Sequence, residues 1–329
     1  MKKRILGRTG LKITELSLGG LFTSSFGSDS FKQSRDVVHA ALELGINYID
    51  TAPTYADSEE VLGRALQNVE TPFYLSTKIG GRLDPFLPQD PTCVRQSIEE
   101  SLSRLKRDHI DIIMVHEPDR PGMYYWWTDF NTYNGPILDV IDELKSEGIV
   151  DYVGLGSTTA YHIEPIIRTG RFDVLLSALN YSLLYREAEA YALQAATEHN
   201  MGIVIGSPFH MGAYNPAHEE HIRAGLLWMS PQRKQQFCSL YDFARDIDIG
   251  LAELALRFVL SNPNVSCALT GARSQAEVEQ NVTAVKKGPL STDILTRLDE
   301  IAKMVPFRPC EEPFILPLQK DSYRLGQAR

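Results

Sequence analysis

The sequence has no long apolar run. No apolar stretch approaches the roughly 20 residues needed to cross a bilayer. The basic start at residues 1–4 is followed by the polar residues 7–10, where a signal peptide would have an apolar stretch. We therefore expect a cytoplasmic protein with no membrane partner.

Metal-binding cysteine patterns and basic clusters are also missing. The four cysteines lie far apart, with no C-x-x-C or Cys/His spacing, so we expect reduced thiols and no metal site. The formal net charge of −9 argues against a nucleic-acid surface, which needs clustered Lys and Arg. A small anionic ligand in a local pocket is still compatible with this charge.

Strand and helix signals alternate along the 329 residues, which is typical of parallel βα units. A barrel of such units takes about 250 residues, so we predict one domain over residues 1–329, a (β/α)8 TIM barrel with insertions. A hairpin at residues 4–13 is expected to plug the barrel floor. The eight strands are expected at residues 15–20, 47–52, 73–78, 110–116, 152–157, 174–180, 202–209 and 265–271.

Helix-start signals separate the expected strands. Ser30 with Gln33 resembles a capping box, as does Asp57 with Glu60. Asp90 directly precedes a proline, which is typical of the first residue of a helix. Further helices are expected at residues 136–148, 161–169 and 186–199.

Four polar residues fall at or just after the ends of three consecutive expected strands: Asp50, Tyr55, Lys78 and His116. The carboxyl ends of barrel strands share one rim, and neighbouring strands lie roughly 5 Å apart. An acid, a phenol, an amine and an imidazole can therefore meet there, which suits acid–base chemistry on a carbonyl or an alcohol. Each residue alone has an ordinary structural explanation, but the combination favours a catalytic site.

Several motifs follow one another at barrel spacing. They are LGRTGL at residues 6–11, GINYIDTAPTY at 45–55, STK at 76–78, DIIMVH at 111–116 and GARSQAEVEQN at 271–281. Together they resemble the motifs of the aldo-keto reductases over nearly the whole chain. Among these enzymes the chain is most similar to the aldose 1-dehydrogenases that act on L-galactose, L-fucose or D-threo-aldoses.

This resemblance implies a nicotinamide-dependent oxidoreductase acting on a small molecule. Tyr55 would be the proton donor in reduction and the base in oxidation, and Lys78 would lower the pKa of that phenol. Asp50 would hold Lys78, and His116 would orient the substrate oxygen. We expect oxidation of an aldose at C1 to the lactone. The alternatives are a broad NADPH-dependent aldehyde or ketone reductase and a non-catalytic, cofactor-sensing barrel.

The resemblance also implies a set of cofactor contacts. They are Gly20, Leu21, Asp50, Ser157, Asn180, Ser207, Pro208, Phe209, Gly271, Arg273, Ser274, Glu277 and Asn281. The chain departs from the family pattern where many relatives bind the nicotinamide carboxamide, because Gly156-Ser157 replaces Ser-Asn and Ala178 replaces Gln. Asn180 and Ser157 are the available substitutes. Gly206 stands where many relatives stack a tyrosine on the nicotinamide.

The adenosine end of the cofactor site carries conflicting charges. Glu277 would repel a 2′-phosphate and could accept a hydrogen bond from a ribose hydroxyl, which favours NAD. The sequence from Ser274 to Glu277 equally fits a capping box. Arg273 suits a phosphate, so NADP remains the alternative.

Three stretches exceed a minimal barrel: residues 117–135, 210–229 and 305–329. Long loops on the catalytic rim of a barrel usually carry specificity. The first stretch follows His116 and is rich in Tyr and Trp, whose flat faces suit sugar rings. Trp127 is the residue most expected to line the substrate pocket, and the alternative is that it pins the loop to the barrel. The sequence contains no signal for an oligomeric state.

Overall fold

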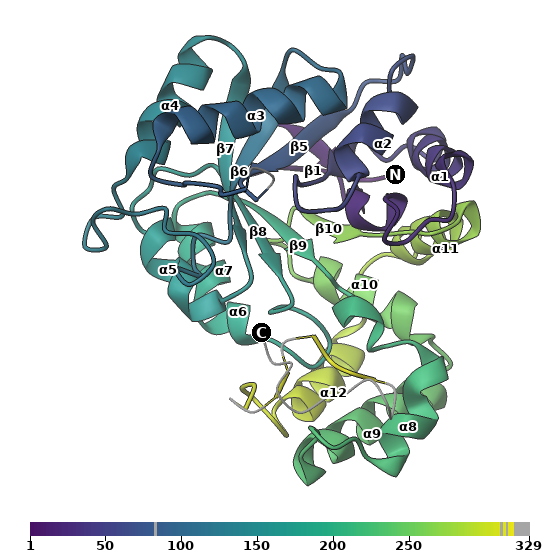
Figure 1. The fold of residues 1–329 in the computed structure, drawn as a ribbon. Helices are drawn as coiled ribbons and strands as arrows, with labels where there is room; N and C mark the ends of the chain where they lie inside the picture. The colour runs from purple at the N-terminus through teal and green to yellow at the C-terminus, as the bar shows by residue number, and fades with distance from the viewer. Residues whose placement is uncertain (82–83, 310–311, 314, 319–329) are drawn as a thin grey trace.

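The computed structural model describes residues 1–81, 84–309, 312–313 and 315–318. Eight parallel strands close into a barrel in the order β10-β3-β4-β5-β6-β7-β8-β9, which confirms the predicted TIM barrel (Figure 1). The strands are β3 Leu16–Gly19, β4 Tyr48–Asp50, β5 Tyr74–Ile79, β6 Ile110–His116, β7 Val150–Ser157, β8 Val174–Ala178, β9 Gly202–Gly206 and β10 Cys267–Thr270.

Helices surround the barrel, and in Figure 1 α8, α9 and α12 form a group beside it. The α-helices are α1 Phe31–Glu43, α2 Ser58–Ala65, α3 Pro91–Leu105, α4 Pro136–Ser146, α5 Ala160–Ile167, α6 Glu187–Ala190, α7 Ala192–Glu198, α8 Glu219–Ala224, α9 Pro231–Asp246, α10 Leu251–Ser261, α11 Gln275–Lys286 and α12 Thr292–Ala302. The short 3₁₀ helices are η1 Gly20–Thr23, η2 His210–Gly212 and η3 Pro216–His218. Among the described residues, no helix is long and apolar enough to cross a membrane.

An N-terminal hairpin covers the end of the barrel where the strands begin. Its strands are β1 Lys3–Ile5 and β2 Lys12–Thr14, paired antiparallel. Leu6 is fully buried in the apolar cluster inside the barrel, and Gly7 forms a β-bridge with Met201, just before β9. The predicted hairpin is thus present, and the opposite end of the barrel is left for the site.

The period-2 alternation of the strands separates two apolar layers. On β6, Ile112 and Met114 belong to the cluster inside the barrel, whereas Ile113 and Val115 pack in the larger cluster that includes the surrounding helices. His116 follows Met114 on the inward-facing series, where the apolar filling gives way to polar side chains. The alternation that builds the core therefore also directs the last residue of the strand into the site.

Most of the expected helix starts are present. Ser30 accepts a hydrogen bond from the Gln33 amide, and Asp90 accepts one from the Thr92 amide. The capping box expected for Asp57 and Glu60 is not formed. The Asp57 carboxylate makes no capping bond to α2 and instead accepts from the Ser25 amide at 2.7 Å. The helix expected at residues 186–199 is divided into α6 and α7.

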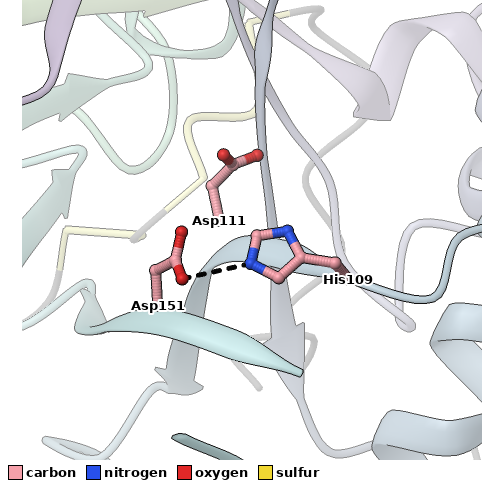
Figure 2. A group of neighbouring side chains, drawn as sticks. All are labelled: His109, Asp111 and Asp151. Carbon is pink, nitrogen blue, oxygen red and sulfur yellow. Dashed lines mark ion pairs between the residues drawn. The ribbon is translucent and has the colours of Figure 1, made fainter. Parts of the chain in front are cut away.

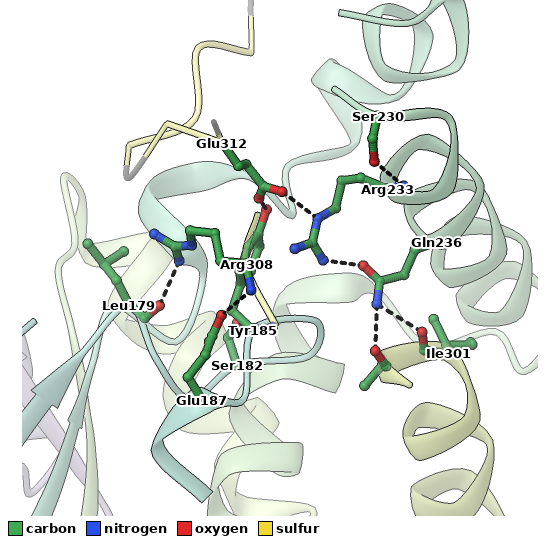
Figure 3. A network of polar contacts seen from close by, with 11 residues as sticks. Leu179, Ser182, Tyr185, Glu187, Ser230, Arg233, Gln236, Ile301, Arg308 and Glu312 are labelled. Carbon is green, nitrogen blue, oxygen red and sulfur yellow. Dashed lines mark hydrogen bonds and ion pairs between the residues drawn. The ribbon is translucent and has the colours of Figure 1, made fainter. Parts of the chain in front are cut away.

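A buried polar network joins the C-terminal segment to the rest of the molecule (Figure 3). The Glu312 carboxylate accepts from Arg233 Nε at 2.9 Å and from the Tyr185 hydroxyl. Arg308 Nη2 donates to the Leu179 carbonyl at 3.1 Å, just beyond β8. Arg233 and Glu312 are almost fully buried, so Glu312 is part of the packed structure.

Candidate active site

Three neighbouring strands bring the four predicted polar residues to one rim. Parallel pairing sets Asp50 at the end of β4 opposite Ser76 on β5, and Lys78 opposite Met114 on β6. His116 ends β6. Tyr55 lies in the turn between β4 and α2, where its amide donates to the Ala52 carbonyl at 3.1 Å.

The Lys78 ammonium lies at the centre of this group. Its Nζ donates to Asp50 Oδ2 and to the Thr51 carbonyl, both at 2.7 Å. The same nitrogen lies 4.6 Å from the centroid of the Tyr55 ring. Lys78 is therefore fixed on one side by a carboxylate and faces the phenol on the other.

Charge and burial oppose each other at Lys78 and Tyr55. Burial alone lowers the pKa of Lys78, but Asp50 and then Tyr55 outweigh it, so the pKa lies above its usual value. Burial raises the pKa of Tyr55, and Lys78 opposes this rise without cancelling it. Near neutral pH, Lys78 therefore keeps its positive charge and Tyr55 keeps a proton that it can donate.

His116 lies beside the same phenol ring. Its ring centroid lies 6.3 Å from that of Tyr55, with the two planes at 82°. Burial, with a smaller effect from Lys78, lowers the pKa of His116 to about 3. The imidazole is thus neutral at neutral pH, and its Nδ1 has no hydrogen-bond partner among the described residues. A neutral imidazole offers one N–H to an oxygen bound beside Tyr55.

A groove of about 440 Å³ runs from the catalytic rim toward α11. Asp50 and Tyr55 line one part of it, and Arg273 and Glu277 line another. The predicted cofactor residues that line it are Leu21, Asp50, Ser207, Pro208, Phe209, Gly271, Arg273, Glu277 and Asn281. The structure therefore brings most of the predicted cofactor set into one groove that also reaches Tyr55.

Four predicted cofactor residues are not among those that line the groove: Gly20, Ser157, Asn180 and Ser274. The Ser157 hydroxyl is buried and donates to Asp119 Oδ2 at 2.9 Å. Asn180 Nδ2 donates to the carbonyls of Thr158 and Ala178. The donors of both side chains are thus used within the protein, and their oxygens remain available as acceptors.

The remaining two have local roles. Ser274 accepts from the Glu277 amide at 3.2 Å as the cap of α11. The Gly20 carbonyl accepts from the Ser58 hydroxyl at 2.9 Å. A Cβ at Gly20 would lie 2.5 Å from that hydroxyl oxygen, so this position has no room for a side chain.

The groove residues suit a long ligand with polar groups. Arg273 supplies a cation and Asn281 an amide, while Gly206 presents no side chain to the groove. A Cβ at Gly271 would lie 2.1 Å from the Phe22 ring, so only glycine lets this ring pack there. The Arg273 guanidinium lies 4.8 Å from the Phe22 centroid. This donor set fits a dinucleotide.

Phe22 was not identified from the sequence, and neither were the groove residues Met211 and Asn215. Phe22 lies on η1 and carries no motif that marks it. Met211 lies in the loop after β9 with a φ of 54°, a backbone conformation that sequence patterns do not predict for methionine. Contacts between distant segments bring these side chains to the groove.

Trp127, expected to line the substrate pocket, lies in the core and does not line the groove. Its side chain is only 1 % exposed, and its Nε1 donates to the Pro118 carbonyl at 3.2 Å. It packs against Phe172 in the core, which matches the alternative that it pins the loop. Tyr124 is the loop aromatic beside the site, half-buried and stacked on His116 with centroids 6.2 Å apart.

One group of potential metal ligands occurs among the described residues, away from the groove (Figure 2). His109, Asp111 and Asp151 have ligand atoms within 4.8 Å of one another. They lie at the beginning of β6 and β7, at the opposite end of the strands from His116. His109 pairs with Asp151 at 3.2 Å, and Asp111 accepts from the Leu75 amide at 2.8 Å. These contacts account for the three side chains as local stabilisers.

Comparison with known proteins identifies the family. The model of the Aldo/keto reductase family matches residues 15–303. A probable voltage-gated potassium channel subunit beta of Arabidopsis thaliana is 27% identical, with 94% of this chain and 99% of that protein covered. The L-galactose dehydrogenase of the same plant is also 27% identical, with coverages of 86% and 87%.

A solved structure agrees with the family match. The holo form of an aldo-keto reductase from Bacillus halodurans superposes with a TM-score of 0.73 at 25% identity, covering 94% of this chain and 99% of that one. Fold, groove and family match thus agree: the chain belongs to the aldo/keto reductase family and is an NAD(P)-dependent oxidoreductase.

Proposed function

We propose that this protein oxidises an unphosphorylated aldose at C1 to the lactone, with NAD as the hydride acceptor and Tyr55 as the general base. One observation carries the catalytic part of this proposal. The Lys78 ammonium is held between Asp50 and the Tyr55 ring, beside a neutral His116, at one end of the groove. Acid–base groups and the cofactor groove therefore meet at Tyr55.

The chain's residues handle the proton and position the substrate. Hydride transfer to and from carbon is the chemistry that a bound nicotinamide supplies. In aldose oxidation, the fraction of Tyr55 that is phenolate, which grows as the pH rises toward its raised pKa, accepts the proton of the C1 hydroxyl. C1 loses a hydride in the same step, and the ring C–O bond remains intact. His116 hydrogen-bonds to the same oxygen. Lys78 stabilises the phenolate, because a nearby positive charge favours the anion.

Cofactor choice rests on Arg273 and Glu277. Glu277 Oε2 accepts from the Arg273 backbone amide at 2.8 Å, and the Glu277 amide donates to Ser274, so the capping contacts are present. Glu277 is nevertheless exposed and lines the groove. The Glu277 carboxylate thus both caps the start of α11 and lines the groove. A carboxylate in the groove favours the ribose hydroxyl of NAD over the 2′-phosphate of NADP.

The Glu277 prediction separates the two cofactors. Wild-type protein should bind NAD more tightly than NADP, and Glu277→Gln should narrow the difference because it removes a negative charge near the phosphate. Titration of tryptophan fluorescence with each cofactor measures both affinities. A wild-type protein that already prefers NADP several-fold would show that Glu277 serves α11 alone.

The proposed substrate class rests on Tyr124 and on a relative. Tyr124 presents a half-buried aromatic ring next to His116, and such rings pack against the C–H faces of sugars. One relative is named as an L-galactose dehydrogenase. The decisive assay follows absorbance at 340 nm. Free aldoses and sugar phosphates are each tested with NAD and NADP, and aromatic aldehydes with NADH and NADPH. Efficient reduction of aldehydes without aldose oxidation would favour a general carbonyl reductase. No turnover with any substrate would favour the non-catalytic alternative.

A further inference from the structure

We infer that Ser76 and Tyr48 are positioning residues for catalysis, because they hold the Asp50 carboxylate that fixes Lys78 beside Tyr55. This inference rests on the proposed roles of Tyr55 and Lys78. Neither Ser76 nor Tyr48 lines the groove, so both would act through Asp50 and not by contact with the substrate or cofactor.

A chain of buried hydrogen bonds connects the two residues to the site. The Ser76 hydroxyl donates to Asp50 Oδ1 at 2.6 Å. The Tyr48 hydroxyl lies 2.8 Å from the Ser76 oxygen. An ionised carboxylate only accepts hydrogen bonds, so the Ser76 hydroxyl donates its single hydrogen to Asp50. In the contact between Tyr48 and Ser76, Tyr48 must therefore be the donor. Burial raises the pKa of Tyr48 well above its usual value, so this donor keeps its proton.

Strand geometry makes this chain of contacts. Asp50 is the register partner of Ser76 across the β4–β5 pair. Lys78 lies two residues beyond Ser76, and Tyr48 lies two residues before Asp50. Residues two apart on a strand share a face, so all four side chains point into the barrel. Tyr48 and Asp50 thus form one row on β4, and Ser76 and Lys78 form a second row on β5. Asp50 accepts hydrogen bonds from both residues of the second row.

Because these residues are buried, water cannot replace a hydrogen bond that is lost among them. Tyr48, Ser76 and Asp50 have no exposed surface, and Lys78 is 2 % exposed. Tyr48 packs with Met114, Leu176 and other members of the apolar cluster inside the barrel. A buried ion pair is stable only when its remaining lone pairs are also satisfied. Ser76 satisfies Asp50 Oδ1, which leaves Oδ2 directed at Lys78.

The chain of contacts ends at Tyr48, which distinguishes positioning from proton relay. A relay to solvent needs an exposed end, and the Tyr48 side chain is fully buried. The effect on catalysis is therefore electrostatic. If Asp50 turns away, Lys78 loses its anchor and shifts, and its charge stabilises the Tyr55 phenolate less. The pKa of Tyr55 then rises.

The experiment compares four single variants with wild type in the aldose assay. Ser76→Ala should lower kcat by roughly tenfold or more, the scale of one lost hydrogen bond to a charged group. Tyr48→Phe removes only a neutral bond and should lower kcat by roughly threefold. In a plot of kcat against pH, the change that reports the ionisation of Tyr55 is called here the pH limb. In both variants this pH limb should move to higher pH, while the NAD dissociation constant stays within about twofold of wild type.

Ser17→Ala is the matched control. Ser17 is another fully buried barrel hydroxyl, bonded to the Ala268 carbonyl and to Cys267 at 3.3 Å, with no bond to Asp50. This variant should leave the pH limb in place. Ser76→Cys separates volume from hydrogen bonding, since a thiol fills the space but donates weakly. It should behave like Ser76→Ala. Tyr48→Phe keeps the ring and provides the test if Ser76→Ala does not fold.

The outcomes separate this inference from the proposed function. If Tyr55→Phe turns over normally, the proposed role of Tyr55 is wrong. If Tyr55→Phe is inactive but Ser76→Ala and Tyr48→Phe both keep the wild-type pH limb, the positioning inference alone is overturned. A wild-type pH limb in Ser76→Cys together with a shifted one in Ser76→Ala would show that Ser76 acts by filling space.

Discussion

Tyr55 is the residue on which the proposed chemistry depends, and its hydroxyl is the simplest group to remove. Tyr55→Phe should reduce kcat by about 10²-fold or more, the usual scale for a positioned acid–base group. Lys78→Met should have a similar effect, because burial then raises the pKa of Tyr55 without opposition. Steady-state kinetics and cofactor titration measure both variants. Cofactor affinity should remain close to wild type, and a near-normal kcat for Tyr55→Phe would contradict the assignment.

His116 links the active site to stability at acid pH. Its pKa of about 3 in the folded protein lies below the ordinary value of 6.5. Between these values the unfolded chain binds a proton that the folded protein excludes, so stability falls as the pH drops from about 6.5 toward 3. From pH 7 to pH 5 the loss from this residue alone should be about 2 kcal/mol.

Urea unfolding at the two pH values measures this effect. In His116→Gln the loss of stability between pH 7 and pH 5 should be smaller than in wild type, because glutamine does not titrate. His210, also buried with a lowered pKa, contributes in both proteins and cancels in the comparison. Equal losses in the two proteins would mean that His116 is not the group responsible.

At the scale of single elements, the loop between β6 and α4 divides its aromatic residues between two tasks. Tyr124 stacks beside His116, whereas Trp127 is buried against Phe172. Tyr124→Ala should raise KM for the aldose severalfold and leave the NAD affinity unchanged, because the substrate loses one packing surface.

Trp127→Phe is the control for this loop. It should lower the melting temperature, because it removes the indole hydrogen bond to Pro118 and part of the buried ring. KM should stay close to the wild-type value. If Trp127→Phe raised KM more than Tyr124→Ala did, the assignment of these two residues would be reversed.

At the scale of the whole molecule, a buried ion pair joins Glu312, near the C-terminus, to Arg233 in α9. Glu312→Ala would leave Arg233, which has no exposed surface, without its carboxylate partner. Removing one member of a buried pair typically costs about 3–5 kcal/mol. Chemical denaturation should show a loss of this order. Glu300→Ala, which breaks the exposed pair with Arg297, should cost less than about 1 kcal/mol. Similar costs for both variants would mean that Glu312 is solvated.

Local periodicity accounts for what could be predicted from the sequence. A residue's face on a strand depends only on counting by two, so the sequence by itself places Asp50, Lys78 and His116 inside the rim. Parallel pairing puts all strand ends on that rim. The meeting of these three side chains at one rim follows from those two regularities, whereas Tyr55 lies in the turn after β4.

Contacts between distant segments decided the rest. The direction of the Ser157 side chain depends on Asp119, whose carboxylate accepts the hydrogen bond of the Ser157 hydroxyl. Trp127 is buried because it packs against Phe172. Glu312 is buried because it pairs with Arg233 in α9. None of these partners lies within the same strand or helix as the residue that it binds. A loop has no period, so its side chains take directions that only the packed molecule determines.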